Sequence, residues 1–330
     1  NMSDYTTIHF SLLEHLPDEL LLDLFEQYIS VVDLYRGFLN LNQRINGLLK
    51  SLDKIKYSLS SNSWEIATPY ISSRIVRLVI SHPFPFSLNP FINLRSLTLK
   101  KANNDQFQKI CSGFISPYLT YLRLILLFNH EVLNHSNTFI NLFSNRFKFL
   151  RKLCILGKMN IPPTTLSACS STPSLRSISI NISKNLYLYS TILSTCPNLV
   201  RLELRVSFIN ISLDFYQHSN LKYLRLQLMD SNWSFHTFKH FLSCVPTVER
   251  LVIQRFRPNT DDNGLRLDHI RFAQILTQYL PLLHQFDCDI LFDSSKFAIN
   301  ISHIHQLHSY FTRIQIEHQQ NGIVRLFTTI

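Results

Sequence analysis

A short hydrophobic pattern recurs along most of the chain: apolar, any two residues, apolar, any one residue, apolar. We find ten copies between residues 75 and 316, and successive copies begin 19 to 35 residues apart. Alternation at the second and third apolar positions predicts a short strand with one buried face. Repetition at this interval predicts a solenoid whose units pack on one another. The copies begin at Ile75, Leu94, Leu119, Leu150, Leu175, Leu199, Leu221, Val248, Leu283 and Phe311.

A second pattern precedes several of these strands. Residues 193–198 read Leu-Ser-Thr-Cys-Pro-Asn, and residues 242–246 read Leu-Ser-Cys-Val-Pro. Proline cannot continue a helix, and the residue before it favours an extended backbone. Each unit is therefore predicted to be a helix, a proline stop and a short strand. The fold class is α/β, with a curved parallel sheet inside and helices outside, and the recurring cysteines are expected to be small buried hydrophobic residues.

Three further segments belong to this array. Residues 55–59 are a candidate first strand, and residues 257–264 are rich in turn-forming residues and read as a surface insertion. Asn321-Gly322 lies between two alternating segments and predicts a hairpin. We expect this hairpin to cover the open end of the parallel sheet, which would otherwise expose an edge.

The pattern ahead of the array is helical. Pro17 suits a first helical turn because its missing N–H would have no partner there, and Asp18 and Glu19 favour the positive end of the helix dipole. Two more short apolar segments follow, up to Leu49. Three helices in about forty residues lie near the lower size limit for an independent core, so we expect a partner. The first helix has apolar residues at steps of three and four: Leu20, Leu21, Leu24, Phe25 and Tyr28.

Composition excludes several classes of protein. The chain has 330 residues, of which 45% are hydrophobic and 16% charged, and this balance argues against intrinsic disorder. Only 6 glycines argue against glycine-rich nucleotide loops, and no run of eighteen apolar residues predicts a membrane span. The first ten residues do not resemble a signal peptide. Six irregularly spaced cysteines are then expected to be reduced, in the cytoplasm or nucleus.

No motif points to catalysis, a cofactor or a metal. The chain has no phosphate-binding glycine loop, no His-Glu-x-x-His and no Cys-x-x-Cys. His303, His305 and His308 have a spacing that allows metal ligation, but no carboxylate or cysteine ligand accompanies them. We therefore interpret them as ordinary polar positions and expect no enzyme.

The helical segment resembles the F-box, the motif that docks substrate receptors onto the Skp adaptor of cullin–RING ubiquitin ligases. Many F-box domains carry a tryptophan near their end, and none lies between Leu39 and Leu49. With the array behind it, the chain resembles F-box proteins with irregular leucine-rich repeats. The Asn or Cys of regular repeats, after the third apolar position, is mostly missing, so we expect less regular curvature. The F-box pattern is met by Leu16, Pro17, Glu19, Leu20, Leu21, Leu24, Phe25, Asp33 and Leu34.

This resemblance implies a substrate-recognition subunit that binds a Skp-type adaptor and, through it, a cullin. Its expected domains are an F-box over residues 10–52, a connecting segment over 53–73, and a repeat solenoid with a C-terminal cap over 74–330. Ligase chemistry would then reside in other subunits. The alternative is a leucine-rich-repeat scaffold that assembles no ligase. The expected adaptor-binding residues are Leu16, Pro17, Leu20, Leu21, Leu24, Phe25 and Leu34.

The target is expected on the open face of the sheet, where residues between the apolar anchors point. Arg201, Arg205, Arg225 and Arg250 fall on three consecutive strands, with Tyr223 among them. At roughly 5 Å between strands, their guanidinium groups could meet one carboxylate or phosphate. A net charge of +10 fits an acidic or phosphorylated target, and a solvated basic surface is the alternative. Nucleic acid is not expected, because no recognition helix or RNA-stacking motif accompanies the charge.

Overall fold

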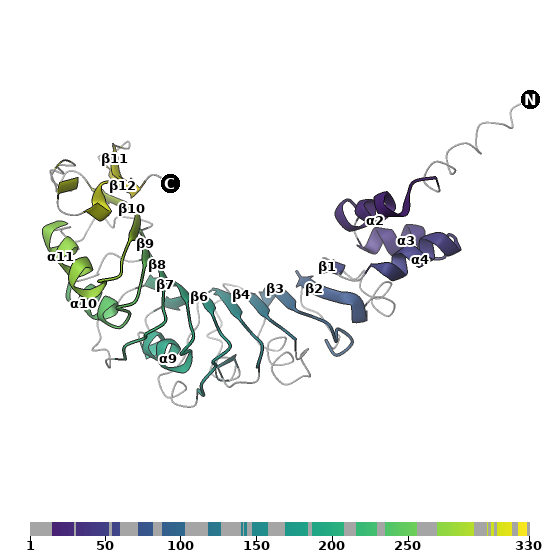
Figure 1. Ribbon diagram of the computed structural model, residues 1–330, viewed down its shortest axis with the longest axis horizontal. Coiled ribbons are helices and arrows are strands. Elements are labelled where there is room, and N and C mark those ends of the chain that lie inside the picture. Colours follow the sequence, from purple (N-terminus) through teal and green to yellow (C-terminus); the bar gives the residue numbers. More distant parts are fainter. Residues whose placement is uncertain are drawn as a thin grey trace, which may run out of the picture.

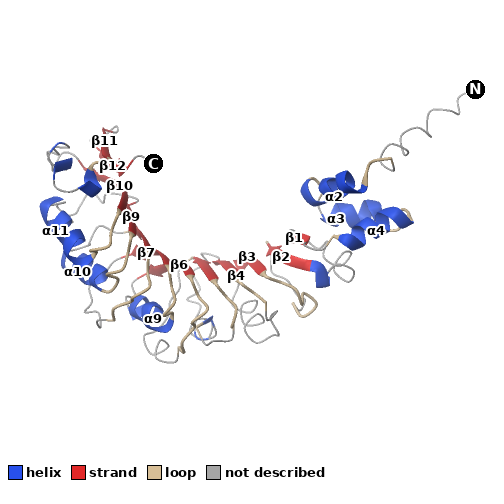
Figure 2. Cartoon of the chain, viewed as in Figure 1, coloured by secondary structure: helices blue, strands red, loops and turns tan. Residues whose placement is uncertain are grey.

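The structure is a computed structural model of the chain, and it combines three N-terminal helices with one long curved sheet (Figures 1 and 2). Twelve strands form the sheet in the part of the chain that is described. The fold class predicted from the sequence is thus confirmed as mixed α/β with a mostly parallel sheet. The described residues are 15–29, 31–52, 55–59, 72–81, 88–102, 118–126, 140, 142–143, 147–157, 169–183, 187–207, 216–229, 235–255, 269–293, 302, 305–306, 309–318 and 323–328.

The first ten strands pair in chain order, and each pair is parallel. The register follows the sequence pattern, since Leu202 lies between Ile178 and Leu224. The candidate strand in the predicted connecting segment is β1, and it joins the sheet beside β2. The ten strands are β1 (Ile55–Leu59), β2 (Ile75–Ile80), β3 (Ser96–Ala102), β4 (Tyr121–Leu126), β5 (Lys152–Leu156), β6 (Ser177–Ser183), β7 (Arg201–Ser207), β8 (Tyr223–Leu228), β9 (Arg250–Arg255) and β10 (Gln285–Asp293).

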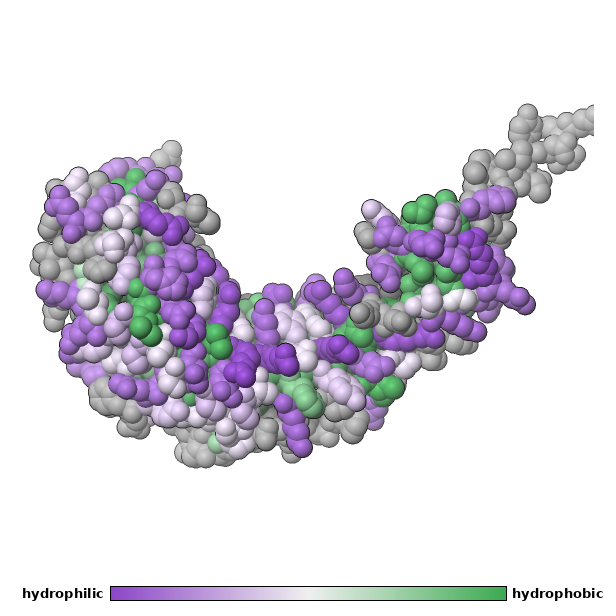
Figure 3. Space-filling model, in the orientation of Figure 1, coloured by the Kyte–Doolittle hydropathy of each residue, from purple (hydrophilic) through white to green (hydrophobic). Residues whose placement is uncertain are grey.

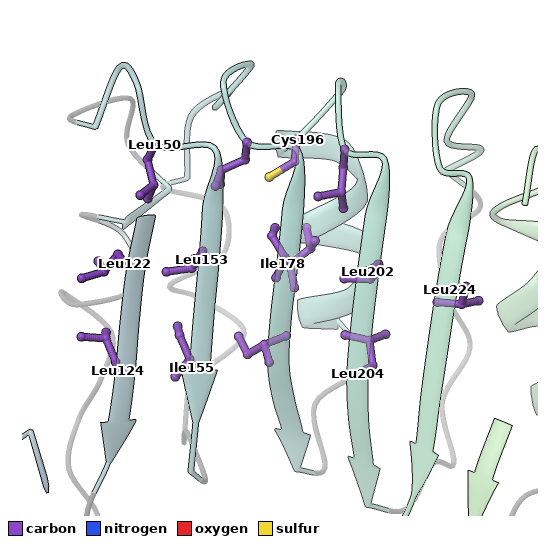
Figure 4. Packing of buried hydrophobic residues seen from close by; sticks show 14 of the residues in the cluster. Leu122, Leu124, Leu150, Leu153, Ile155, Ile178, Cys196, Leu202, Leu204 and Leu224 are labelled. Carbon is purple, nitrogen blue, oxygen red and sulfur yellow. The ribbon is translucent and has the colours of Figure 1, made fainter. Parts of the chain in front are cut away.

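Buried aliphatic anchors hold the strands together. The second anchors of consecutive copies form one row across the sheet, and the third anchors form another (Figure 4). Alternate residues of β4 and β8 are buried, as a strand with one solvated face requires. Every anchor therefore contacts its counterparts on both sides, so stability is shared between neighbouring copies. The first of these rows includes Leu122, Leu153, Ile178, Leu202 and Leu224.

Three helices lie on the convex side of the sheet: α9 (Tyr187–Thr195), α10 (Phe235–Ser243) and α11 (His269–Tyr279) (Figure 1). Each ends shortly before a proline, at Pro197, Pro246 and Pro281 respectively. The predicted order of helix, proline stop and strand is thus confirmed for these three copies. Cys196 and Cys244 follow the ends of α9 and α10 and are buried, as expected of small hydrophobic residues.

The turns that enter the strands carry a hydrogen-bond ladder that sequence reasoning missed. The residue before the first anchor reaches a backbone carbonyl of the preceding copy, as when Asn198 Nδ2 donates to the Pro173 carbonyl at 3.0 Å. Regular leucine-rich repeats have their Asn ladder after the third anchor, whereas the donors of this ladder lie before the first anchor. In the sequence, this ladder is marked by a polar residue that recurs directly before the first anchor of several copies. The donors are Asn93, Ser174, Asn198, Asn220 and Thr247.

The C-terminal end differs from the prediction. The strands β11 (Ile314–His318) and β12 (Ile323–Thr328) are antiparallel, as a hairpin requires, and their turn lies outside the described residues. However, β12 also pairs with β10, so it separates β11 from the parallel strands. The tenth copy of the pattern, at Phe311, does not form a further parallel strand as predicted, because β12, with Val324 and Leu326 buried, takes the place beside β10. Phe311 lies in the short helix η3 (Ser309–Phe311) instead.

The N-terminal helices are α2 (Asp18–Gln27), α3 (Val31–Phe38) and α4 (Gln43–Ser51). Pro17 precedes α2, and Asn42 caps α4 by accepting a hydrogen bond from the Ile45 N–H at 2.8 Å. Arg44 forms an ion pair with Asp18 at 2.7 Å, which ties α4 to the start of α2. The three short helices expected from the sequence are therefore present.

We predict that Leu202→Asp unfolds the neighbouring strands, because it places a charge in the buried row between Ile178 and Leu224. The expected loss is at least about 3 kcal/mol in the free energy of unfolding, measured by urea denaturation. Val200→Asp is the matched control, since this neighbouring side chain is exposed and should tolerate a charge. Equal stability of the two variants would contradict the buried row.

His218 gives the array a pH-dependent contact. Its side chain is 1% exposed in the turn before β8. Nε2 donates to the Cys196 carbonyl at 2.9 Å, and Nδ1 accepts from the Asn220 N–H at 3.2 Å. This pairing uses both ring nitrogens of a neutral imidazole. Burial lowers the pKa of His218, and the hydrogen bond to the Cys196 carbonyl opposes this shift only in part.

We predict that the free energy of unfolding falls as the pH drops below about 6.5, the pKa of an unfolded histidine. In that range the unfolded chain takes up a proton at His218 before the folded chain does, so acid favours unfolding. Urea denaturation from pH 8 to pH 5 should show a shallower pH dependence for His218→Gln than for the wild type. If the free energy of unfolding depends on pH equally in both proteins, groups other than His218 cause the pH dependence.

Candidate functional site: two exposed surfaces

The first candidate surface lies on the N-terminal helices. We define the N-terminal surface as Leu16, Pro17, Leu20 and Leu24. The Leu20 side chain is 56% exposed and Pro17 is exposed, while Leu16 and Leu24 are half-buried. Figure 3 shows apolar residues at the surface of these helices. An exposed leucine beside an exposed proline at a helix start is available to a protein partner.

The other three residues that were expected to bind an adaptor are buried inside the bundle. Leu21, Phe25 and Leu34 are 0%, 2% and 1% exposed. They fill the interior of the bundle, where the ring of Phe25 lies 5.2 Å from that of Phe38. In this arrangement they hold α2 and α3 together, so a contact with an adaptor is left to the exposed members. The leucine pattern alone does not separate the two sets.

The second candidate surface is the open face of β7 to β9. Arg201, Tyr223 and Arg250 lie in one row across these strands. The guanidinium carbon of Arg201 is 4.1 Å from the centroid of the Tyr223 ring, and that of Arg250 is 5.6 Å from it. The structure thus brings these three residues together as the sequence predicted, with the aromatic ring between two cations.

These arginines already have acceptors within the sheet. Arg201 donates twice to Glu203 Oε1, at 2.8 and 2.6 Å, and Arg250 donates twice to Asp287 Oδ2, at 3.1 and 2.7 Å. Arg225 Nη2 donates to a neutral group, the side-chain oxygen of Gln254, at 2.7 Å. Much of the positive charge on this face is therefore neutralised internally. The sequence predicted that these guanidinium groups meet one external anion, but Arg201 and Arg250 bind carboxylates of the sheet instead.

Arg205 completes the set of predicted target-binding residues. It is exposed on β7, and its neighbours in the adjacent strands are Asn181 and Gln227. The insertion at 257–264 lies outside the described residues. Both row neighbours of Arg205 are thus neutral, whereas Arg225 has Glu203 beside it in its own row.

Acidic residues also organise the C-terminal end. Asp289 accepts from Arg325 at 2.8 and 3.1 Å, and this contact raises the pKa of Arg325. Asp287 accepts from Gln285 at 3.0 Å as well as from Arg250. These contacts join β12 and β9 to β10, so the charges here serve the sheet itself.

Sequence reasoning missed a separation of charge along the chain. Residues 55–202 hold 16 of the 32 Lys and Arg residues but only 3 of the 22 Asp and Glu residues. None of those 3 acidic residues lies within the described part of this segment. The whole positive excess of the chain thus belongs to β1 to β6 and their connections. Counting charge by segment would have found this signal.

Burial makes the described thiols less reactive. Burial raises the pKa of Cys154, and it raises the pKa of Cys169 to about 11 and that of Cys288 to about 12, so these thiols stay protonated. His305 Nε2 donates to the Ile314 carbonyl at 2.8 Å, whereas His303 and His308 lie outside the described residues. Among the residues that the structure describes, no three His, Cys, Asp or Glu side chains are placed to hold a metal ion.

Comparison with known proteins adds no identification. No family model matches the chain, and no curated protein is similar enough to count as a relative. Within the described residues, no helix has the length and apolar character needed to cross a membrane. The N-terminal surface and the open face of the sheet are therefore the features that bear on function.

Proposed function

We propose that this chain is the substrate-recognition subunit of an SCF-type ubiquitin ligase. In this proposal, helices α2 to α4 are an F-box that binds a Skp-type adaptor, and the strands β1 to β10 belong to a leucine-rich-repeat solenoid that binds a protein target. The observation that carries the proposal is the N-terminal surface: Pro17 and Leu20 are exposed and Leu16 is half-buried beside them, while Leu21 and Phe25 fill the bundle.

The energetics of the bundle support a partner there. Three helices of 8 to 10 residues form only a small bundle, and Leu20 of the N-terminal surface is more than half exposed. Covering a leucine side chain that is otherwise in water contributes about 1.5–3 kcal/mol. A partner that covers this surface would thus stabilise both itself and the bundle.

The shape of the molecule supports two separate binding functions. The helices lie at one end of the arc, and the open face of the sheet follows its inner side (Figure 1). A protein bound to the N-terminal surface leaves the middle of that face accessible. This is the arrangement that a receptor needs if it holds an adaptor and a target at the same time.

We predict that the double change Leu16→Ala and Pro17→Ala abolishes co-purification with a Skp-type adaptor. Removing exposed anchors at the centre of an interface typically costs about 2–4 kcal/mol of binding free energy, which is a loss of roughly 30-fold or more. The matched control is Leu41→Ala, a truncation at a leucine of the same bundle that is 50% exposed but lies outside the N-terminal surface.

Circular dichroism and urea denaturation should show that both variants remain folded. A folded double variant that retains the adaptor would contradict the assignment of this surface. If the wild-type chain does not bind the adaptor at all but captures a protein through the sheet, it is a scaffold that assembles no ligase.

A further inference from the structure

The basic residues of β3 to β6 differ from those of β7 to β9 in having no acidic partner among the described residues. We define the basic face as six residues of this region, and no ion pair joins any of them to another described residue. Five of the six are on or beside β3, β4 and β5, strands whose neighbours in the sheet carry no acidic residue. The basic face consists of Arg95, Lys100, Arg123, Arg151, Lys152 and Arg176.

Register places these cations around small side chains. Arg123 lies beside Cys154, which lies beside Ser179, and Lys152 lies beside Ser177. Lys152 also lies over the ring of Tyr121, 5.5 Å from its centroid, so these strands combine cations with small and aromatic side chains and carry no acidic residue. The turns add Arg95, Arg151 and Arg176, all of which are exposed.

Arg123 has an unsatisfied donor on this face. Its Nε is buried and has no hydrogen-bond partner among the described residues. A buried N–H of a charged group without an acceptor destabilises the free protein, and an anion that reaches it removes that penalty. Arg225 Nε on β8 is buried and unsatisfied in the same way, so this donor shows that the basic face is more than a set of fully solvated cations, while the absence of acidic neighbours separates it from β7 to β9.

Two aromatic residues border the basic face. Tyr118 is 56% exposed and Phe149 is 53% exposed. Both occupy the position before the first anchor, in consecutive copies, where five other copies have the polar ladder residue. Large apolar side chains beside cations provide contact area for a segment that carries both negative and apolar groups.

We propose that the basic face binds a short acidic segment of a protein, with its carboxylate or phosphate groups on the cations and its apolar side chains on Tyr118 and Phe149. This inference rests on the proposed function, because it names the chemistry of the target that the receptor would hold. It moves recognition from the arginines of β7 to β9, two of which pair with carboxylates, to the cations of β3 to β6, which form no ion pair with a described residue although Arg176 donates to the Asn198 carbonyl at 3.1 Å.

The charges on either side favour a short segment over a nucleic acid. The face spans three strand spacings, about 15 Å, which an extended peptide of four to five residues covers. Glu203 lies beyond it on β7, and α2 carries Asp18 and Glu19 near the other end of the chain. A long polyanion would meet these carboxylates, whereas a short acidic segment would not.

The test uses the full chain and three fluorescent probes of about eight units: a glutamate peptide, a peptide with two phosphoserines among neutral residues, and a single-stranded oligothymidylate. Anisotropy titrations at about 50 mM and about 300 mM salt compare the wild type with the variant Arg95→Gln, Arg151→Gln, Lys152→Gln. The matched control is Arg201→Gln, Arg250→Gln, Arg325→Gln, which removes the same charge from the internally paired half.

The wild type should bind at least one acidic peptide more tightly at low salt, and the first variant should bind it roughly tenfold more weakly. The control should stay within about twofold of the wild type. An equal loss in both variants would overturn the proposal, because net charge would then suffice. Tighter binding of the oligothymidylate than of either peptide would overturn the class of partner. The tighter of the two peptides identifies carboxylate or phosphate as the preferred group.

Adaptor co-purification of the same variants keeps this inference separate from the proposed function. Peptide binding by a chain that fails to bind the adaptor would contradict the ligase assignment while supporting the basic face. Adaptor binding without any acidic-peptide binding would contradict the basic face alone.

Discussion

The row of buried aliphatic anchors across the parallel strands is the interaction on which the rest of the structure depends. Ile178, Leu202 and Leu224 occupy the same register position and are fully buried. Because a strand alternates its side chains between two faces, burial of one set commits the other set to the open face. The functional surface of the sheet is therefore a direct consequence of its core. A shift of one residue in register would bury the arginines and expose the leucines.

The two halves of that open face differ in what surrounds each cation. In β7 to β10, Arg201 and Arg250 lie within hydrogen-bonding distance of Glu203 and Asp287, so the sheet supplies its own anions. In β3 to β6, the neighbours of Lys100, Arg123 and Lys152 in the sheet are uncharged: Ile125, Thr98, Cys154, Tyr121 and Ser177. The same residue type thus stabilises the array in one half and remains available to a partner in the other.

Local patterns predicted the strands, the ends of three helices and the N-terminal helices, because periodicity and proline act within a few residues. Contacts between distant positions were not predictable in this way. Asp287 is 37 residues from Arg250, and the insertion of β12 between β10 and β11 depends on which strand buries Val324 and Leu326. Likewise, Leu20 and Leu21 are equivalent in a sequence pattern, and packing against α3 and α4 decides which one is exposed.

The N-terminal helices also depend on the array. The apolar residues of the bundle belong to the same buried cluster as the anchors, and Leu52, Ile55 and Tyr57 continue it into β1. Arg74 crosses this junction by donating to the Leu49 carbonyl at 3.1 Å. A bundle of about forty residues cannot bury enough surface to be stable alone. Its exposed leucines are therefore held in place by the sheet, and cutting the chain near residue 52 would remove that support while uncovering β1. Adaptor binding and target binding are thus best compared by single-site changes in the full chain.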